Sequence, residues 1–383
     1  MSRASRGPRR AAAAAPRFLV PLIRPYITAE VKREVCAVLD SGYLTEGPVT
    51  RKLENAFKEY IGCAHAIAVT SCTTGLEIAL RALGIGAGDE VIVPAFTYPA
   101  TADAVALVGA TAVLVDIAPD TLLLDCEAAQ RAITPRTKAL LPVSLFGNPL
   151  DYDRLDALKR AHRLHIIEDA ACAIGAEYRG KKVGRFADIS VFSLHPRKFI
   201  TTGEGGIITT RDAGWARWMN SYKHFGMAEP AAAGRARFER LGTNYKLSSL
   251  QAAVGVAQMR HIEELLARRR RLAQRYLDLL AGNRRVTLPV TTAGGRHSWQ
   301  SFCIQIENRD AVMAAMRRRG LEVQIGSYAL HLERAFAPGP HCRWAGELKV
   351  SARAYERSLA LPLYHGLRFR EQEAVVQALK ELV

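Results

Sequence analysis

The hydrophobic pattern of this chain switches repeatedly between the spacing of a helix and the short apolar runs of a buried strand. Helical spacing begins in TAEVKREVCAVLDSG, where Thr28 is placed to cap a helix and Gly42 to end it. Strand-like segments such as HAIAVTS, DEVIVPAF and TAVLVDI then alternate with helical segments such as TTGLEIALRALG and TADAVALVG. This alternation predicts right-handed crossovers and an α/β fold with a mostly parallel central sheet covered by helices.

The pattern changes near residue 246. The stretch KLSSLQAAVGVAQMRHIEELLARRRRLAQRYLDLL has continuous helical spacing, with room for one break. Beyond it, SWQSFCIQIE, RDAVMAAMRRRG, LEVQIGS and EQEAVVQALKEL predict a second, smaller α/β unit. We therefore predict a flexible basic arm at residues 1–17, a large domain at residues 18–260 and a small C-terminal domain at residues 261–383.

Composition narrows the class of protein. The chain has 383 residues, of which 49% are hydrophobic and 23% charged, as in ordinary globular proteins with a sizeable core. Its apolar runs stay short of the ~18 residues that span a bilayer, and its start has no apolar segment followed by a cleavage site. The 7 cysteines are scattered without metal-ligand spacing. We expect a cytoplasmic protein with reduced thiols, no membrane segment and no metal.

The formal net charge of +16 raises the possibility of nucleic-acid binding. The arginines, however, are spread over the arm, residues 268–271 and residues 317–319, and no aromatic residues interleave with them. We expect solvated helix faces that attract anionic substrates, and no nucleic-acid partner. A regulatory protein that binds nucleic acid through its arm remains the alternative from a different class.

Three local signals in the large domain suggest chemistry. In TSCTTGLEIALRAL, residues 71–74 lead straight into a helix, so free N–H groups and hydroxyls converge where a phosphate could bind. An ordinary helix cap explains the same residues. Asp169 in HIIEDAACAIGA follows a buried strand at the edge where α/β proteins bind ligands, although it too could cap a helix. The neighbouring Glu168 is expected to face away.

The third signal is Lys198 in SLHPRKFITTGEGGIITT, on a loop between two predicted strands. Such a lysine can be a surface cation, or a desolvated amine with a depressed pKa that forms a Schiff base. A phosphate cradle, a carboxylate for a pyridinium nitrogen and a Schiff-base lysine together make a pyridoxal phosphate site. A dinucleotide fits poorly, because GIGAGDE lacks the G-x-G-x-x-G spacing and precedes a strand.

From about residue 19 to its end, the chain resembles the fold type I sugar aminotransferases of the DegT/DnrJ/StrS family. The resemblance rests on SGYLTEGPVTRKLENAF, VPAFTYPATADAV, PVSLFGNPLD, IIEDAACAIGA, FSLHPRKFITTGEGG, GTNYKLSSLQAAVG and LALPLY. It implies a large pyridoxal-phosphate-binding domain, and a cofactor that cycles through pyridoxamine phosphate. It also implies transfer of an amino group from glutamate to a keto sugar, often nucleotide-linked, or to an aminocyclitol precursor.

The resemblance also implies roles around the cofactor ring. Lys198 would form the Schiff base and move protons, and Asp169 would pair with the pyridine nitrogen. Tyr98 would lie against the ring face. Cys172 stands where the family often has Gln, near the phenolic oxygen of the cofactor.

Four further residues are implied for the phosphate. Cys72, Thr73 and Ser193 would bind it from the same chain. Asn244 would reach it from the neighbouring subunit of a homodimer, which would make each active site a shared one. The alternative for Asn244 is a local helix cap near residue 247.

The sequence departs from the family pattern at three positions. Besides Cys172, it has Ser144 where His is frequent and Cys72 where Gly is frequent. We expect these three changes to leave the transamination chemistry intact and to affect which substrate the protein binds. A related branch of dehydratases has His in place of the lysine, so Lys198 argues against that alternative.

Overall fold

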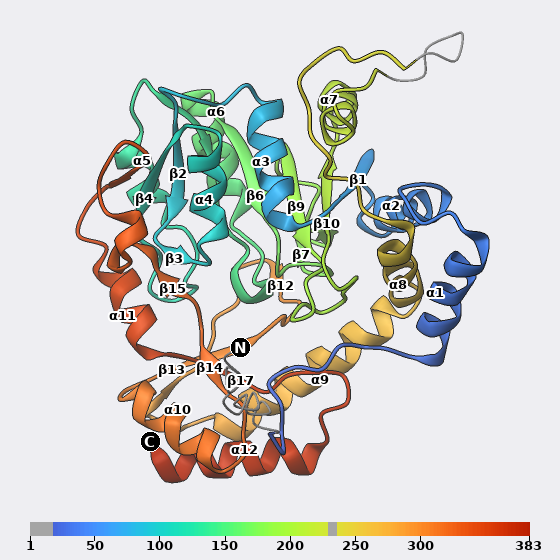
Figure 1. Ribbon diagram of the computed structural model, residues 1–383. Helices are drawn as coiled ribbons and strands as arrows, with labels where there is room; N and C mark the ends of the chain where they lie inside the picture. Colours follow the sequence, from blue (N-terminus) through green and yellow to red (C-terminus); the bar gives the residue numbers. More distant parts are fainter. Residues whose placement is uncertain (1–17, 229–235) are drawn as a thin grey trace, which may run out of the picture.

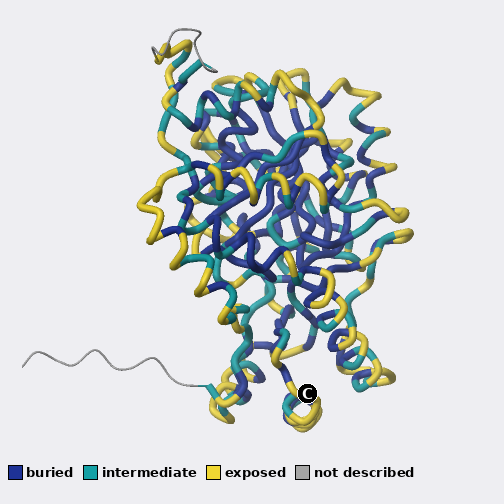
Figure 2. Tube along the Cα trace, turned by 90° about the vertical axis from the view of Figure 1, so that its right-hand side faces the viewer, coloured by how far each residue is buried: buried dark blue, intermediate teal, exposed yellow. Residues whose placement is uncertain are grey.

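The computed structural model describes residues 18–228 and 236–383, which form two α/β units joined by a long helix (Figure 1). The predicted basic arm at residues 1–17 lies outside the described residues. Figure 2 shows that buried residues concentrate inside the larger unit. Within the described residues, every helix is too short or too polar to cross a lipid bilayer.

The larger unit is built on an eight-stranded sheet. In spatial order its strands are β1 (His65–Val69), β10 (Gly206–Thr210), β9 (Ile189–Ser193), β6 (His165–Asp169), β5 (Thr137–Leu140), β2 (Glu90–Pro94), β4 (Thr111–Val115) and β16 (Cys342–Trp344). Only β10 runs antiparallel to its neighbours in this sheet. The predicted mostly parallel sheet is therefore confirmed.

Both faces of this sheet are buried, because its strands are apolar at successive positions. In β2, Ile92 packs into one core, while Val91 and Val93 pack into the core on the opposite face. One face is covered by α3 (Cys72–Ala82), α4 (Ala100–Leu107) and α7 (Ala213–Lys223). The other is covered by α2 (Pro48–Ile61), α5 (Cys126–Ala132), α6 (Tyr152–His162) and α8 (Ser249–Met259).

The helix boundaries read from sequence agree with the structure. The first helix, α1 (Ala29–Ser41), is capped by Thr28, whose hydroxyl accepts a hydrogen bond from the Val31 N–H at 3.3 Å. It ends at Gly42, which has a φ of 67°, a conformation that favours glycine. The long helical stretch is broken once, between α8 and α9 (Ile262–Leu280).

The smaller unit has an antiparallel sheet in the order β11 (Val286–Thr287), β13 (Phe302–Ile306), β17 (Ser358–Leu361) and β14 (Gln324–Ile325). Helices α9, α10 (Arg309–Arg318) and α12 (Phe369–Leu382) pack on it around buried Tyr276 and Tyr364. Helix α11 (Lys349–Arg357) lies beside the larger unit (Figure 1).

Two segments cross between the units. Val20 lies in the core of the smaller unit, next to Leu22, whose N–H donates to Glu322 Oε2 at 2.8 Å. In the opposite direction, β15 (Tyr328–Ala329) pairs with β3 (Phe96–Thr97), and β16 pairs in parallel with β4. The domain boundary at residue 260 stays a prediction. Each of these two segments packs on the unit across that boundary, because its partners lie far away in sequence.

The remaining elements are short. A three-stranded sheet contains β12 (Gly295–Arg296), β7 (Glu177–Tyr178) and β8 (Lys181–Lys182). Single 3-10 turns occur at η1 (Leu145–Gly147), η2 (Leu330–Leu332) and η3 (Arg334–Phe336). Of these, η1 contributes directly to the wall of the cavity described next.

Candidate active site

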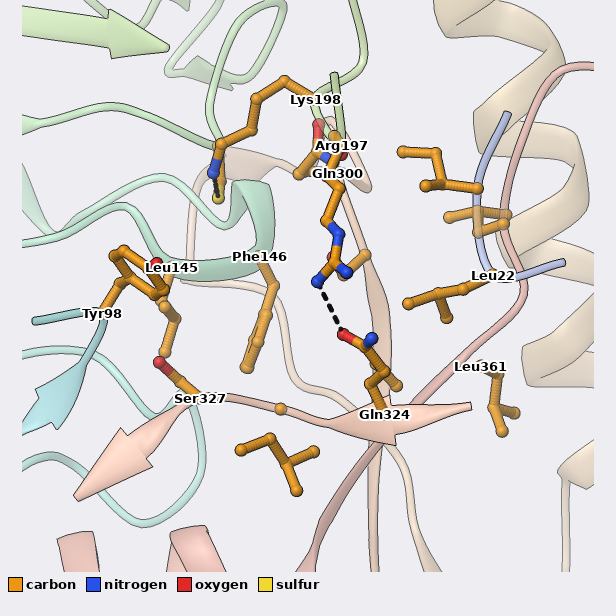
Figure 3. Close-up of a pocket in the computed structure, with 17 residues that line it drawn as sticks. Leu22, Tyr98, Leu145, Phe146, Arg197, Lys198, Gln300, Gln324, Ser327 and Leu361 are labelled. Carbon is orange, nitrogen blue, oxygen red and sulfur yellow. Dashed lines mark hydrogen bonds between the residues drawn. The ribbon is translucent and has the colours of Figure 1, made fainter. Parts of the chain in front are cut away.

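A cavity of about 170 Å³ lies between the carboxyl ends of the large sheet and the small sheet (Figure 3). Its lining residues come from both units: Leu22, Ile23, Tyr98, Leu145, Phe146, Cys172, Arg197, Lys198, Gln300, Ser301, Gln324, Ile325, Gly326, Ser327, Ala360, Leu361 and Leu363. Three residues predicted from sequence, Tyr98, Cys172 and Lys198, are among them. This position matches the edge at which open α/β sheets bind ligands.

Lys198 lies on the loop between β9 and β10, as its sequence context predicted. The loop is closed by its own backbone, since the Lys198 N–H donates to the His195 carbonyl at 2.8 Å and the Thr202 N–H to the Leu194 carbonyl at 3.0 Å. Gly203, with a φ of 86°, allows the turn that follows. The lysine backbone is therefore held in one place.

Gln300, which sequence reasoning missed, fixes this loop from the smaller unit. Its side-chain oxygen accepts from the Phe199 N–H at 2.6 Å, and its side-chain nitrogen donates to the Arg197 carbonyl at 2.7 Å. One amide thus brackets Lys198 on both sides. The segment SWQSFCIQIE does not single out Gln300, which precedes β13 and has Ser298 and Ser301 close by.

The Lys198 amine points toward Cys172, with 3.2 Å between Nζ and Sγ (Figure 3). Burial of the amine opposes its charge. The neighbouring Cys172 sulfur and the Asp169 carboxylate outweigh burial and raise the pKa of Lys198 above its ordinary value. The depressed pKa expected from sequence is therefore wrong for this arrangement, because acidic neighbours surround the amine.

Asp169 ends β6 and is buried. Its carboxylate accepts hydrogen bonds from the Thr101 hydroxyl at 2.8 Å and from the Ala171 N–H at 3.1 Å. Burial nevertheless raises the pKa of Asp169 above its usual range. A turn follows Asp169 in place of a helix, so the Ala171 contact is a local turn and not a helix cap.

Glu168 faces away from this cavity, as expected. Its carboxylate accepts hydrogen bonds from the hydroxyls of Ser144, Tyr152 and Ser190 at 2.5, 2.6 and 2.8 Å. Alternation along β6 therefore sends Glu168 into a polar cluster in the interior and Asp169 toward the site. Ser144, one of the departures from the family pattern, belongs to this interior cluster.

The start of α3 lies beside Asp169. Ser71 caps the helix by accepting from the Thr74 N–H at 3.1 Å, which leaves the N–H groups of Cys72 and Thr73 without an intrahelical partner. Cys72 Sγ lies 4.0 Å from Asp169 Oδ1. The helix cap and the free N–H groups are thus both present at the same turn.

Glycine is required where β10 begins. A Cβ on Gly206 would lie 2.6 Å from the carbonyl oxygen of Ser71. The strand after the lysine loop can therefore pack directly against the turn before α3. Ser193, which ends β9 beside it, has a hydroxyl that accepts from the His195 N–H at 3.3 Å.

Tyr98 lines the cavity, whereas Asn244 lies outside it. Tyr98 follows β3 and lines the cavity with 64% of its surface exposed, so its ring face is accessible to a ligand. Asn244 is exposed outside the cavity lining, and its side-chain oxygen accepts from Lys246 Nζ at 2.7 Å. The cap of α8 is Ser248, so the local capping role considered for Asn244 is wrong.

These groups suit pyridoxal phosphate. The half-buried Lys198 with its amine, a buried carboxylate at Asp169 and the start of α3 meet at one edge of a parallel sheet. Such a donor set matches an aldehyde, a pyridine nitrogen and a phosphate. The fold is that of the fold type I pyridoxal-phosphate-dependent transferases.

Comparison with known proteins identifies the family. Residues 25–380 match the DegT/DnrJ/EryC1/StrS aminotransferase family. S. venezuelae DesV, solved with a ketimine intermediate, is 36% identical, with a TM-score of 0.88 over 96% of this chain and 98% of that one. The chain belongs to the DegT/DnrJ/EryC1/StrS aminotransferase family, whose cofactor is pyridoxal phosphate.

Two more distant structures have the same fold over nearly the full chain. A putative sugar aminotransferase from Streptococcus pneumoniae, in its PMP form, is 28% identical with a TM-score of 0.88, covering 95% of this chain and 98% of that one. Helicobacter pylori PseC, an aminotransferase involved in the biosynthesis of pseudoaminic acid, is 25% identical with a TM-score of 0.88, covering 96% and 99%.

Proposed function

We propose that this aminotransferase moves an amino group from glutamate to a keto sugar, nucleotide-linked or free, or to an aminocyclitol precursor. The observation behind this proposal is the Lys198 amine, held beside Cys172 and Asp169 in a cavity formed by both units. The family membership and the sugar-related names of two similar structures support the acceptor class. The product would serve amino-sugar or secondary-metabolite biosynthesis, including that of antibiotics.

We propose the following holders of the cofactor. Lys198 would bind it covalently, Asp169 would pair with its ring nitrogen and Tyr98 would lie on its ring face. The N–H groups of Cys72 and Thr73, together with the Thr73 and Ser193 hydroxyls, would bind the phosphate: residues 72 and 73 open α3, and Ser193 ends the neighbouring β9. Cys172, within 3.2 Å of the lysine amine, would lie near the phenolic oxygen.

When bound, pyridoxal phosphate supplies a carbonyl that condenses with amines and a ring that accepts electrons released at the α carbon. Lys198 Nζ then acts as the base that removes the α proton of the donor and returns a proton to the acceptor carbon. The negative charge of Asp169 stabilises a proton on the ring nitrogen. Its fixed position, held by Thr101 and the Ala171 N–H, means that little reorganisation accompanies the reaction.

We further propose a homodimer in which Asn244 completes the phosphate site of the partner subunit. Asn244 is exposed and lies outside the cavity of its own chain, on the segment that precedes α8. Exposed Phe225 and Leu241 lie on the same stretch, which is suited to burial against a second copy. An isologous dimer would use the same contact twice and build two equivalent sites.

Loading the purified protein with pyridoxal phosphate tests the function. We expect a visible absorbance band, conversion to the pyridoxamine form by glutamate, and amination of a keto sugar from a panel of free and nucleotide-linked sugars. Lys198→Ala should lose the band and turnover while its thermal unfolding stays close to that of the wild type. If borohydride fixes the cofactor to a different lysine, or glutamate leaves the absorbance unchanged, the proposal is wrong.

A further inference from the structure

One turn of the smaller unit, residues 298–301, contacts two loops of the active site. The Ser298 hydroxyl donates to the Cys172 carbonyl at 3.2 Å. The Gln300 amide binds the main chain on both sides of Lys198, at 2.6 and 2.7 Å. The position of this turn therefore determines where the lysine loop lies relative to the rest of the cavity wall.

The backbone of this turn is strained at Trp299. This residue has a φ of 58°, in the left-handed region that is unfavourable for a bulky side chain. His297 holds it from one side, since its Nδ1 accepts from the Trp299 N–H at 2.8 Å and the two rings stack with 3.9 Å between their centres. A bulky residue stays in this conformation only where its surroundings hold it, so the turn depends on such contacts.

Arg269 of α9 holds the same turn through its carbonyl groups. Its Nη1 donates to the carbonyls of Trp299 and Gln300 at 3.0 and 2.9 Å. It also donates to the carbonyl of Leu363, a residue of the cavity lining, at 3.1 Å. The guanidinium carbon lies 5.2 Å from the centre of the Phe199 ring on the lysine loop, within the range of a cation–π contact. One side chain thus joins two segments of the smaller unit to the lysine loop.

Arg269 is a buried cation whose acceptors are neutral. Only 3% of its surface is exposed, and its hydrogen bonds in the described part of the chain all go to main-chain carbonyls. Burial lowers the pKa of Arg269 to about 10, so the side chain is still charged at neutral pH. A buried charge is costly unless its hydrogen bonds are made. The guanidinium therefore stabilises only arrangements in which the three carbonyls converge on it, and a shift of the turn away from α9 is penalised.

We propose that Arg269 is a positioning residue for transamination. It holds the turn at residues 298–301, and through Gln300 this turn holds the loop that carries Lys198. Arg269 itself lies outside the cavity lining, so it acts through Gln300 and not on the reacting atoms. The arginines at residues 268–271, expected from sequence to form a solvated helix face, thus include one buried member. This inference rests on the proposed role of Lys198 as the residue that binds the cofactor.

Hydrogen exchange of the full-length protein, before it is loaded with cofactor, tests this positioning without turnover. Arg269→Met removes the charge and all three hydrogen bonds but keeps an apolar stem. We expect the amides of residues 195–202 to exchange about 10-fold faster, because the acceptor of the Phe199 N–H is no longer held in place, while exchange in β4 stays unchanged. Arg269→Lys keeps a charged donor and should show a smaller effect. Arg271→Met, at an exposed position on the same helix, is the control and should exchange like the wild type.

Kinetics of the holoenzyme test whether the effect passes through Gln300. Arg269→Met should lower kcat by about 10- to 100-fold with little change in KM for glutamate, because the reacting amine is misplaced. The pH dependence of the cofactor–lysine absorbance should shift in the same direction as in Gln300→Met. The double variant should be at most about twofold slower than the slower single variant, since both changes release the same loop.

Two results would overturn the proposal: faster exchange spread evenly over both units with kcat unchanged, or losses of kcat that multiply in the double variant. If Arg269→Met does not fold, Arg269→Lys decides, and wild-type exchange and kcat in that variant count against the proposal. A failure of the role proposed for Lys198 would be seen separately, as cofactor fixed by borohydride to another lysine, and would leave the exchange result as it is.

Discussion

At the scale of single residues, the site places two ionisable groups where burial and neighbours act in opposite directions. Burial disfavours the charge of Asp169 and raises its pKa, while the same carboxylate helps to keep the nearby Lys198 amine protonated. Each group therefore stabilises the charge of the other. A cofactor that uses the amine covalently and offers a pyridinium to the carboxylate would provide a new partner for Asp169.

The Asp169→Asn variant removes the negative charge of this side chain but keeps its size and shape. The amide oxygen can still accept from the Ala171 N–H, and its NH2 group can donate to the Thr101 hydroxyl oxygen, so the fold and cofactor occupancy should change little. Turnover should fall by about 100-fold or more, as is typical when one preorganised electrostatic group is lost. Single-turnover rates with glutamate, compared with the absorbance of bound cofactor, measure the two effects separately. Near-normal rates would mean that Asp169 only stabilises the turn after β6 and has no part in the reaction.

Lys198 and Asp169 could be found from sequence because their local context is unusual, an amine among glycines and a carboxylate at the end of an apolar strand. The role of Gln300 could not be found in this way. It depends on contact with Phe199, 101 residues away in the chain, and therefore on how the two units meet. The raised pKa of Lys198 likewise depends on Cys172 and Asp169, which only the folded chain brings together.

At the scale of elements, the lysine loop is held by one amide from outside the larger unit. Gln300→Met has a similar shape and loses both hydrogen bonds to the loop. We expect kcat to fall by roughly 10- to 100-fold, because small misplacements of a reacting group are costly, while KM for glutamate changes little. Steady-state kinetics give this split.

Gln274→Met, at an exposed position on α9, is the control and should behave like the wild type. A positioning role also predicts a changed pH dependence of the cofactor–lysine absorbance in Gln300→Met. If that variant shows only a lower unfolding temperature with unchanged kcat, Gln300 is structural.

The edge strand β16 is attached through a buried ion cluster. Glu90 of β2, only 1% exposed, accepts hydrogen bonds from Arg343 of β16 at 2.8 and 3.0 Å, and from Thr134 and Arg136. Burial alone would raise the pKa of Glu90. These hydrogen bonds, led by those from Arg343, lower it to about 2.

A lowered pKa predicts loss of stability in acid. Above its ordinary value of 4.5 the Glu90 carboxylate is charged in both states, and its native contacts contribute fully. As the pH falls from about 4.5 toward 2, the unfolded chain takes up the proton first, so a contribution on the order of 3 kcal/mol is lost.

Urea unfolding at pH 7, 5 and 3 measures this loss. Glu90→Gln should be less stable than the wild type at pH 7 but should lose less stability between pH 5 and pH 3. Glu127→Gln, from an exposed ion pair with Arg154, is the matched control and should follow the wild type. Parallel losses in the wild type and Glu90→Gln would contradict the assignment.

Element types were predictable because they depend on local periodicity, as the agreement of α1 with its capping residues shows. The pairing of β16 was not. Arg343 and Glu90 lie 253 residues apart, and CRW has no alternation long enough to identify a strand. β16 pairs with β4 at the edge of the large sheet, and its Arg343 is the cation that binds the buried Glu90 carboxylate.

At the scale of the whole molecule, the proposed shared site predicts complementation between inactive variants. Lys198→Ala and Asn244→Ala should each have little activity as homodimers. Mixed dimers would place both lesions in one site and leave the other intact. After full exchange of equal amounts, activity should return to about a quarter of the wild-type value, because half of the dimers are mixed and half of their sites are intact.

Subunit exchange must be verified independently, for example by native mass spectrometry of isotopically labelled subunits. Lys198→Ala mixed with Asp169→Asn is the control, since both residues belong to the same chain's site and each mixed dimer then has one lesion in each site. If the Lys198→Ala and Asn244→Ala mixture recovers no activity after confirmed exchange, Asn244 does not contribute to the partner's site.

The attachment of β16 also bears on how the protein is made. Until residues 342–344 have left the ribosome, β4 is the outermost strand of the large sheet, with unpaired N–H and C=O groups along an apolar strand. The nascent chain therefore passes through a stage in which most of the sheet can form but one margin is open to other chains. Messages that end early would yield polypeptides that aggregate through β4, whereas the finished chain seals this margin with its own late segment.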